Sequence, residues 1–249
     1  MGMSTEKNQQ KGRAAAVGLN REKVVAAALL LIDEKGLAAF SLRELSRRLK
    51  VSTAVIYWHV GGKQEDLFAE LSAYITREIT QNIDNEQIWQ ARIRSIFQRY
   101  RELLHQHPNV SPLLGAQMKS NGVANLIWIE AIFCALDEAG FKGDDLRDAF
   151  NALIGGLAGF VTMELAPSPK DHHYQWRDSQ IERVTQIDVE QFPYTYAAIP
   201  RLSNQIFVLR WQNGVDVSYD SSFETLLDLL IEGLEYRANK LGASNVVES

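Results

Sequence analysis

The chain has 249 residues, of which 46% are hydrophobic and 23% are charged, and this balance excludes a disordered or fibrous protein. Its longest stretch without a charged residue or a histidine, Ala149–Met163, has 15 residues, fewer than the roughly 20 that span a bilayer, so no membrane association is expected. The N-terminus has no apolar core of a secretory signal. Because Cys134 is the only cysteine, no intrachain disulfide can form, and a cytoplasmic location is expected.

Charge is distributed unevenly along the chain. Residues 1–63 hold 11 Lys plus Arg against 5 Asp plus Glu, whereas residues 64–249 hold 15 against 26. Basic side chains release counterions from phosphates, and acidic surfaces repel nucleic acid. The distribution favours a small DNA-binding head on an acidic body, with a chance asymmetry as the alternative.

The first elements form a compact N-terminal unit. Residues 1–19 lack an apolar period and are interpreted as a disordered leader, either solvated or an arm on DNA. Apolar residues then recur every three or four positions until Gly36, which predicts a helix over residues 21–35. Ser41 and Glu44 form a capping box that predicts a helix over residues 42–49.

The third helix follows a tight turn. Ser52 is placed to cap a helix over residues 53–60, which stops at Gly61. Residues 20–65 are therefore expected to fold as a helix-turn-helix domain.

The rest of the chain also has helical periodicity, and no convincing two-residue alternation competes with it, so the predicted fold class is all-α. Residues 66–241 are expected to form a regulatory and dimerisation body, and residues 242–249 a flexible tail. Helices are predicted over residues 63–81, 86–105, 123–139, 144–165, 192–213 with a break near Pro200, and 222–241; residues 108–119 are predicted to be broken, residues 166–190 irregular and residues 214–219 a loop.

Residues 41–63 carry the pattern from which a function follows. A helix, a tight turn and a second helix form the frame that places the second helix in the major groove of DNA. The first turn of this second helix must reach base edges, and the groups at the helix ends must hold phosphates. Thr53, Ala54 and Val55 suit the first turn. No Gln, Asn or Arg lies on that turn, so its direct base readout is expected to be thin.

The head resembles the tetracycline-repressor (TetR) family over about residues 21–71. The resemblance is carried by Ser41-Leu42-Arg43-Glu44-Leu45 and by Ile56-Tyr57-Trp58-His59-Val60 before Lys63. It implies a three-helix DNA-binding head, with Arg43 reaching a guanine edge or a phosphate and the later residues anchoring the DNA backbone. The full expected set is Arg43, Ser52, Thr53, Ala54, Val55, Tyr57, Trp58, His59 and Lys63.

Several of these residues have a second interpretation. Trp58 suits the core of the small head as well as it suits a phosphate, and Tyr57 can pack one ring face there. His59 is expected to face DNA, because an exposed helix end disfavours a buried histidine. Arg47 and Arg48 fit a simple solvated face.

Small residues mark a possible dimer face in the body. Gly155 and Gly159 lie four residues apart on one helical face, where backbones can approach closely, although tight packing within one chain gives the same spacing. The resemblance favours a homodimer, because family members commonly pair through their last long helices. The expected interface is Gly155, Gly159, Phe223, Leu227, Leu230 and Leu234, and a twofold pair predicts a near-palindromic DNA operator.

The body is also expected to bind a small-molecule effector with apolar or aromatic surface. Candidate lining residues are Phe97, Tyr100, His105, Trp128, Phe133, Phe160, Met163 and Glu164; most are expected to be plain core, and no more than about half to line a cavity. The body resembles the tetracycline-repressor subtype loosely, but Leu113 or Leu114 and Ala166 or Pro167 replace its metal-chelate residues. His105 and His107 lie on different helical faces and His172 and His173 in a predicted loop, so no metal or other cofactor is expected.

The sequence therefore predicts a ligand-responsive, homodimeric DNA-binding regulator, interpreted as a repressor. An alternative is a helical DNA-binding protein that is regulated by a protein partner. A third is an enzyme with a vestigial head, but the chain has no Gly-x-Ser-x-Gly elbow, phosphate loop, dinucleotide fingerprint or His-Glu-x-x-His motif, so an enzyme is not expected.

Overall fold

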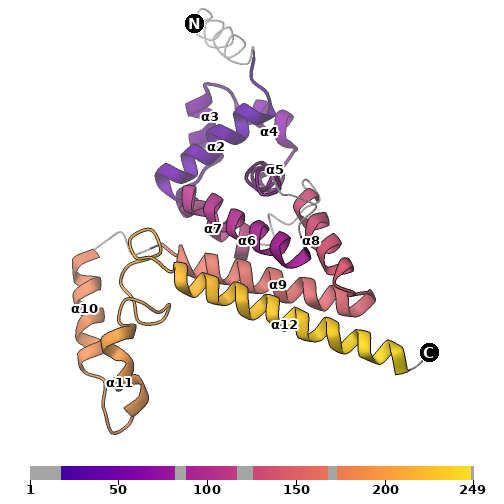
Figure 1. Ribbon diagram of the computed structural model, residues 1–249. Coiled ribbons are helices and arrows are strands. Elements are labelled where there is room, and N and C mark those ends of the chain that lie inside the picture. Colours follow the sequence, from indigo (N-terminus) through magenta and orange to yellow (C-terminus); the bar gives the residue numbers. More distant parts are fainter. Residues whose placement is uncertain (1–17, 82–87, 117–125, 168–172, 248–249) are drawn as a thin grey trace, which may run out of the picture.

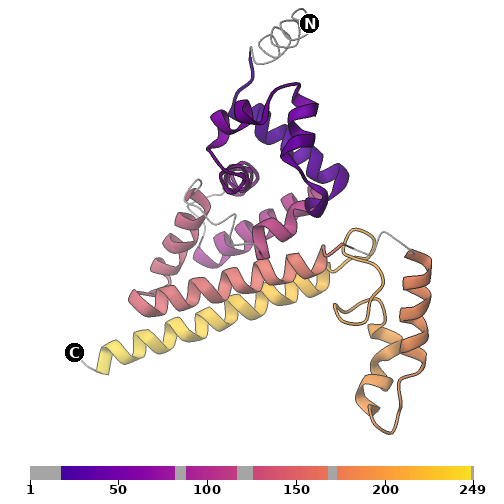
Figure 2. The same ribbon diagram turned by 180° about the vertical axis from the view of Figure 1, so that it is seen from behind.

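The computed structural model describes residues 18–81, 88–116, 126–167 and 173–247, and within these ranges every regular element is a helix. Figure 1 shows a head at the N-terminal end, a middle layer of α6, α7 and α8, and the long helices α9 and α12 on the side away from the head. Figure 2, the view from behind, shows α10 and α11 as an arm beside this stack. The predicted all-α fold is confirmed. Most of the predicted leader, residues 1–17, lies outside the described ranges.

The head begins with three helices at the predicted positions, α2 (Arg21–Lys35), α3 (Leu42–Leu49) and α4 (Thr53–Val60). The Asn20 side chain accepts a hydrogen bond from the Lys23 backbone N–H at 2.9 Å, and Ser41 Oγ accepts one from Glu44 N–H at 3.2 Å. These bonds satisfy backbone donors that a helix start leaves free. A short 3₁₀ turn, η1 (Leu37–Ala39), lies between the first two helices.

The turn between α3 and α4 contains a residue in an unusual conformation. Lys50 has φ 56° and ψ 35°, the left-handed region. Its N–H donates to the Arg47 carbonyl at 3.3 Å, and the Val51 N–H donates to the Ser46 carbonyl at 3.1 Å. This is the Schellman termination, in which glycine is the usual residue at the Lys50 position. Left-handed backbone is about 1–2 kcal/mol less favourable for a residue with a Cβ atom.

The recognition helix α4 ends at a glycine that the next helix requires. Gly61 has φ 108°, and a Cβ atom there would lie 2.5 Å from the Asp66 Cβ. Asp66 accepts the Lys63 N–H at 3.0 Å and so caps α5 (Gln64–Thr76).

α5, which connects the head to the body, is shorter than the helix predicted over residues 63–81. Residues 77–81 form turns in place of regular helix. The Ser72 and Thr76 hydroxyls donate to the Phe68 and Ser72 carbonyls and so compete with the helical N–H groups near this end.

The body helices lie close to their predicted positions. They are α6 (Trp89–Gln106), η2 (Pro108–Val110), α7 (Ser111–Ala116), α8 (Ile127–Glu138), α9 (Gly143–Glu164) and α12 (Asp220–Val247). Their apolar faces join those of the head in one continuous core. α12 continues past the predicted end at residue 241, so most of the expected tail, residues 242–249, is helical as far as Val247.

Two predictions between α9 and α12 were wrong. α10 (His173–Thr185) is a helix in the segment predicted to be irregular. It was missed because its few apolar residues are too sparse to reveal a helical period. α11 (Pro193–Leu202) ends just after Pro200, where a break was predicted, but no helix continues to residue 213. There the Asn204 side chain accepts the Trp211 and Gln212 N–H groups, each at 3.1 Å, and closes a loop instead.

The head meets the body at a second place besides α5. Asp33, near the end of α2, has Oδ2 2.8 Å from His107 Nδ1, and its backbone carbonyl accepts a hydrogen bond from Asn109 Nδ2 at 2.8 Å. These two residues lie at and just after the end of α6. The head is therefore held by α2 as well as by the covalent connection through α5.

Candidate DNA-binding surface, effector region and dimer face

The recognition helix α4 divides its side chains between the head core and the outside. Ile56 and Val60 are buried in the core, whereas Thr53 and Ala54 are exposed and Val55 is half-buried. The Ser52 hydroxyl accepts the Val55 N–H at 3.4 Å, so Ser52 positions the helix start. The predicted base-reading turn is therefore accessible to a DNA groove.

The aromatic residues at the end of α4 are not core residues. The Trp58 side chain is 82% exposed, which excludes it from the core of the head. Its ring meets the His59 ring edge-on, with centroids 4.7 Å apart. The His59 carbonyl accepts a hydrogen bond from Arg21 Nε at 3.2 Å, which ties the end of α4 to α2. An exposed tryptophan beside a histidine and the exposed Lys63 is suited to a phosphate backbone.

The three arginines of α3 differ in their partners. Arg47 bonds Glu44 at 2.6 Å, and Arg48 bonds Glu34 of α2 at 2.7 Å. Hydrogen bonds, first from Arg47 and then from Lys35, lower the pKa of the Glu44 carboxyl. Arg43 is exposed, and its guanidinium has no acidic partner among the described residues. Of these arginines, Arg43 is thus the one with its donors free for DNA.

The predicted effector residues lie at several places in the body. Phe97 and Tyr100 are buried on α6, and the Tyr100 ring lies 6.1 Å from that of Trp128 on α8. Burial raises the pKa of the Tyr100 hydroxyl, which stays protonated. Residues 117–125, between α7 and α8, lie outside the described ranges. The Tyr100 and Trp128 rings therefore meet between α6 and α8.

The remaining aromatic candidates lie elsewhere. Phe133 stacks on Phe150 of α9 with centroids 4.5 Å apart, and Phe160 lies 5.4 Å from Phe223 of α12. Met163 is 46% exposed on α9. These residues are therefore spread along α8 and α9, and their part in an effector site stays a prediction.

Glu164, the last residue of α9, is fully buried and lies in an ionic cluster. Arg101 Nη2 lies 2.6 Å from its Oε1, Arg101 Nε donates to its Oε2 at 3.0 Å, and His105 Nε2 lies 3.1 Å from Oε1. Burial by itself would raise the pKa of Glu164, but the imidazole and the guanidinium outweigh it and the pKa is lowered. Arg101 also pairs with Asp220 of α12 at 2.8 Å.

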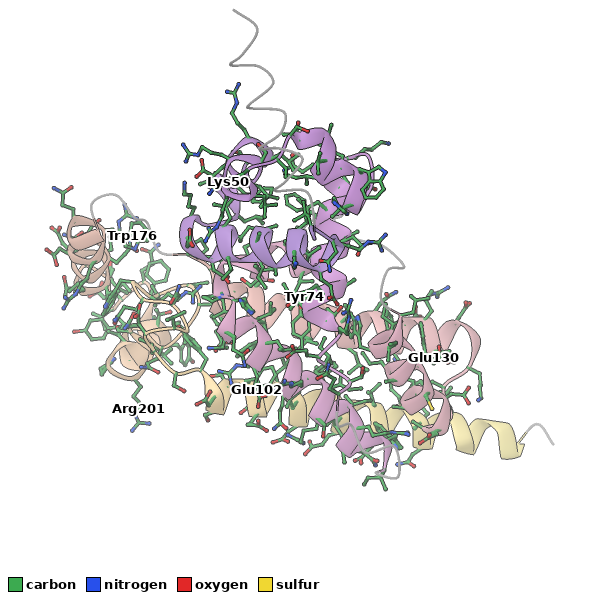
Figure 3. The ribbon with its side chains drawn as sticks, turned by 90° about the horizontal axis from the view of Figure 1, so that it is seen from above. Lys50, Tyr74, Glu102, Glu130, Trp176 and Arg201 are labelled. Carbon is green, nitrogen blue, oxygen red and sulfur yellow. The ribbon has the colours of Figure 1, made fainter. Side chains whose placement is uncertain are left out.

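The cluster joins three body helices and opens on a groove. Glu164 and His105 were predicted as ligand contacts, whereas Arg101 was not. The four-residue spacing of Arg101 and His105 on α6 was the available signal. The groove has a volume of about 370 Å³ between α6 and α12, and Glu102 on its rim is labelled in Figure 3. Its lining is polar, formed by Gln98, Arg101, Glu102, His105, Asp220, Phe223 and Glu224.

α9 and α12 run side by side and leave one face uncovered by the described chain (Figures 1 and 2). Gly155 and Gly159 of α9 are exposed, and a Cβ atom on either would meet nothing within 4 Å. Between them, Gly156 is needed within the chain, because its Cβ would lie 3.1 Å from Leu230 Cδ1. Packing inside one chain therefore explains Gly156 but neither of the exposed glycines.

The predicted dimer residues of α12 divide into two groups. Phe223 and Leu227 are enclosed in the chain's own core, so they do not belong to the open face. Leu230 and Leu234 line an apolar groove of about 230 Å³ between α9 and α12. Leu229, at its edge, and Tyr236 are 65% and 71% exposed and were not predicted.

Other classes of site find no support in the part of the chain that the structure describes. No three His, Cys, Asp or Glu side chains there are placed to hold a metal ion. His105 faces Glu164 of α9, whereas His107 faces Asp33 of α2, on a different side of the α6 end, as predicted. His172 lies outside the described ranges. No described helix is long and apolar enough to cross a membrane.

These features define a helix-turn-helix DNA-binding head on a helical body. Residues 24–71 match the family model described as bacterial regulatory proteins, tetR family, and residues 83–238 match the tetracyclin repressor-like C-terminal domain. The chain belongs to the TetR family of DNA-binding transcription regulators, as its head motif predicted. The family is one of regulatory proteins and not of enzymes.

Individual relatives agree with this assignment. An HTH-type transcriptional regulator of Saccharopolyspora erythraea is 30% identical over 146 residues, which are 59% of this chain and 61% of that protein. ActR of Streptomyces coelicolor, in complex with actinorhodin, has a TM-score of 0.65 at 18% identity and covers 87% of this chain and 95% of its own. BioQ with its double-stranded DNA operator has a TM-score of 0.56 at 22% identity, and the match covers 88% of this chain and 99% of the BioQ chain. The chain spans about three fifths of the first relative, and the two structures share its fold.

The free guanidinium of Arg43 predicts a loss of sequence preference when it is removed. Arg43→Ala is expected to weaken binding to a selected operator by about 1–3 kcal/mol and to weaken binding to random duplex less. Arg48→Ala is the matched control, because the Arg48 guanidinium is already bound to Glu34. It should change the affinity for neither duplex. Competition titrations with the two duplexes measure the difference. Equal losses on both duplexes in Arg43→Ala would refute its role in reading bases.

The lowered pKa of Glu164 predicts a pH-dependent contribution to stability. The ordinary carboxyl pKa is 4.5 and the folded value is lower, so the stabilisation is complete above about pH 4.5 and is lost as the pH falls through the folded pKa. At pH 7, Glu164→Gln is expected to lower the free energy of unfolding by about 3 kcal/mol, and this difference should shrink below pH 4.5.

Urea titrations at several pH values test this expectation. Glu102→Gln is the control, because the Glu102 side chain is 62% exposed and pairs with the neighbouring Arg99. A difference between wild type and Glu164→Gln that does not change with pH would show that the carboxylate charge is not the stabilising feature.

Proposed function

We propose that the chain is a homodimeric transcriptional repressor that binds a near-palindromic operator and releases it when a small molecule binds the body. The observation that carries the proposal is the open face of α9 and α12. Gly155, Gly159 and Gly233 are exposed there, and a Cβ atom on any of them would meet nothing within 4 Å. Each glycine weakens its helix by about 1 kcal/mol relative to alanine. A second copy packed closely against this face supplies the reason for them.

A twofold dimer dictates the form of the operator. Two copies paired through α9 and α12 present two α4 helices related by the same axis, so they read inverted half-sites about 34–36 Å apart or somewhat further. BioQ, which shares the fold, has been solved with its double-stranded operator, and this supports DNA as the partner of the head.

The proposed effector is a small molecule with aromatic or apolar surface. Supporting this class are Tyr100 and Trp128, with ring centroids 6.1 Å apart, and the buried Phe97 on the same helix as Tyr100. The fold neighbour ActR has been solved with actinorhodin. His105, five residues after Tyr100 on α6, offers a polar contact in the groove beside α12.

α6 is suited to couple the two sites. It carries Tyr100 on its buried side, its end is joined to Glu164 through His105, and just beyond that end His107 contacts Asp33 of the head. An effector that prefers a shifted position of α6 would therefore move α2 together with α5. Only a difference in effector affinity between the two arrangements is required for release.

Selection from a random duplex pool tests the proposal directly. Retained sequences should be near-palindromes, and binding should fall steeply with salt because phosphates are neutralised. Compounds added to the purified complex should then release the operator. Recovery of isolated half-sites would contradict the dimer, and failure to recover any sequence from protein freed of small molecules would contradict operator binding.

The exposed glycines predict a substitution that separates folding from dimerisation. Gly155→Gln with Gly159→Gln adds long polar side chains that open space accommodates within one chain, so each protomer should be no less stable. The same side chains block close approach of a second copy and should yield a monomer in sedimentation equilibrium. Gly62→Gln, also exposed with nothing within 4 Å of its Cβ, is the control and should stay dimeric. A dimeric double variant would place the interface elsewhere.

A further inference from the structure

Lys50 is one of two described residues other than glycine with a positive φ, and the two differ in what they gain from it. The other, Asn204, uses its side chain to accept the Trp211 and Gln212 N–H groups. The Lys50 ammonium is exposed and has no ion-pair or hydrogen-bond partner among the described residues. Only the Lys50 backbone takes part in ending α3, and a glycine would do this with less strain. Nothing within the described chain therefore explains a lysine at this position.

The position of Lys50 relative to α3 suggests a reason outside the chain. Arg43 and Arg47 lie four residues apart on one face of α3, Lys50 follows in the turn at its end, and all three are exposed. Glu44 neutralises Arg47 in part, at 2.6 Å. This row, which we name the α3 cation row, leads from Arg43 to the turn before the recognition helix.

The turn itself lies beside the base-reading residues. Lys50 precedes Thr53, the first residue of α4, by three positions. Figure 3 looks onto the head from above, where Lys50 lies on the head and Arg201 on the arm. A lysine on a flexible stem is a point charge that suits a phosphate, whereas bidentate recognition of a base edge suits arginine.

We propose that Lys50 binds a phosphate of the DNA backbone next to the bases read by α4, and that the strained backbone of the turn is kept for this contact. The inference rests on DNA binding by the head and adds a contact that the sequence motif did not reveal. It assigns a function to a conformational strain that has no compensation within the described chain. Each head would gain one phosphate contact from it.

Lys50→Gly tests the proposal because it removes the ammonium and relieves the backbone together. The thermal midpoint should be unchanged or raised by up to about 4 °C. Affinity for DNA at low salt should nevertheless fall roughly three- to tenfold per head, and the slope of log affinity against log salt should become shallower by about 0.9 per head. A loss of binding in a variant that is at least as stable cannot come from misfolding.

Three further variants complete the test. Lys50→Asn keeps a residue that tolerates the left-handed conformation and should lose binding as glycine does. Lys50→Arg should keep the salt slope of the wild type. Arg201→Gln removes an exposed cation from α11 on the arm and should leave binding unchanged, which controls for net charge.

The probes are a fluorescent random-sequence duplex and a duplex selected by the wild-type protein. A phosphate contact predicts the same fold-loss on both. Unchanged affinity and slope in Lys50→Gly would overturn the proposal, and so would a loss confined to the selected duplex, because that would indicate a base contact. Failure of the wild type to bind either duplex would refute DNA binding by the head, a result distinct from either of these.

Discussion

The body depends on keeping one carboxylate charged where it is fully buried. Glu164 ends α9, and its charge is held by Arg101 and His105 of α6, while Arg101 also pairs with Asp220 at the start of α12. The Glu164 backbone carbonyl accepts hydrogen bonds from the Gly214 N–H at 2.8 Å and from the Arg210 guanidinium at 3.0 Å. A buried charge without partners is very unfavourable, so these segments cannot separate independently. The ends of α6, α9 and α12 are thereby fixed to one another.

The same arrangement makes the end of α6 the link between body and head. His105 and His107 are two residues apart and face opposite neighbours, the body through Glu164 and the head through Asp33. A displacement of α6 therefore reaches α2 directly, in addition to the path through α5. Because Asn109 also holds the Asp33 backbone carbonyl, the contact constrains the position of α2 and not only a side chain.

Much of the fold and the DNA surface could be predicted because local signals determine them. Ser41 and Ser52 cap the helices that they were expected to cap, Asn20 caps α2, and Gly61 ends α4. Local patterns cannot say which apolar side chains share a cavity, since that depends on how helices pack. For this reason the sequence could not say whether Phe133 and Met163 share a pocket with Tyr100. The polar helix α10 was missed because its sequence has almost no apolar face.

The left-handed conformation of Lys50 also could not be predicted from the sequence. A lysine after an amphipathic helix is ordinary, and only the backbone dihedral angles identify it as strained. The open face of α9 was partly predictable, because glycine spacing marks close approach. The structure was needed to separate Gly156, which the chain uses internally, from Gly155 and Gly159, which it does not.

The arm, α10 and α11, has a consequence for the integrity of the molecule. α11 has no buried residue, so its sequence is free of core packing constraints. The chain enters the arm from α9 and leaves it toward α12, and these two helices pack against each other through contacts such as Gly156 with Leu230. A backbone cut within α11 would therefore leave two fragments held together by α9 and α12. The arm is thus a suitable place to insert a foreign peptide or to divide the protein into two complementing halves.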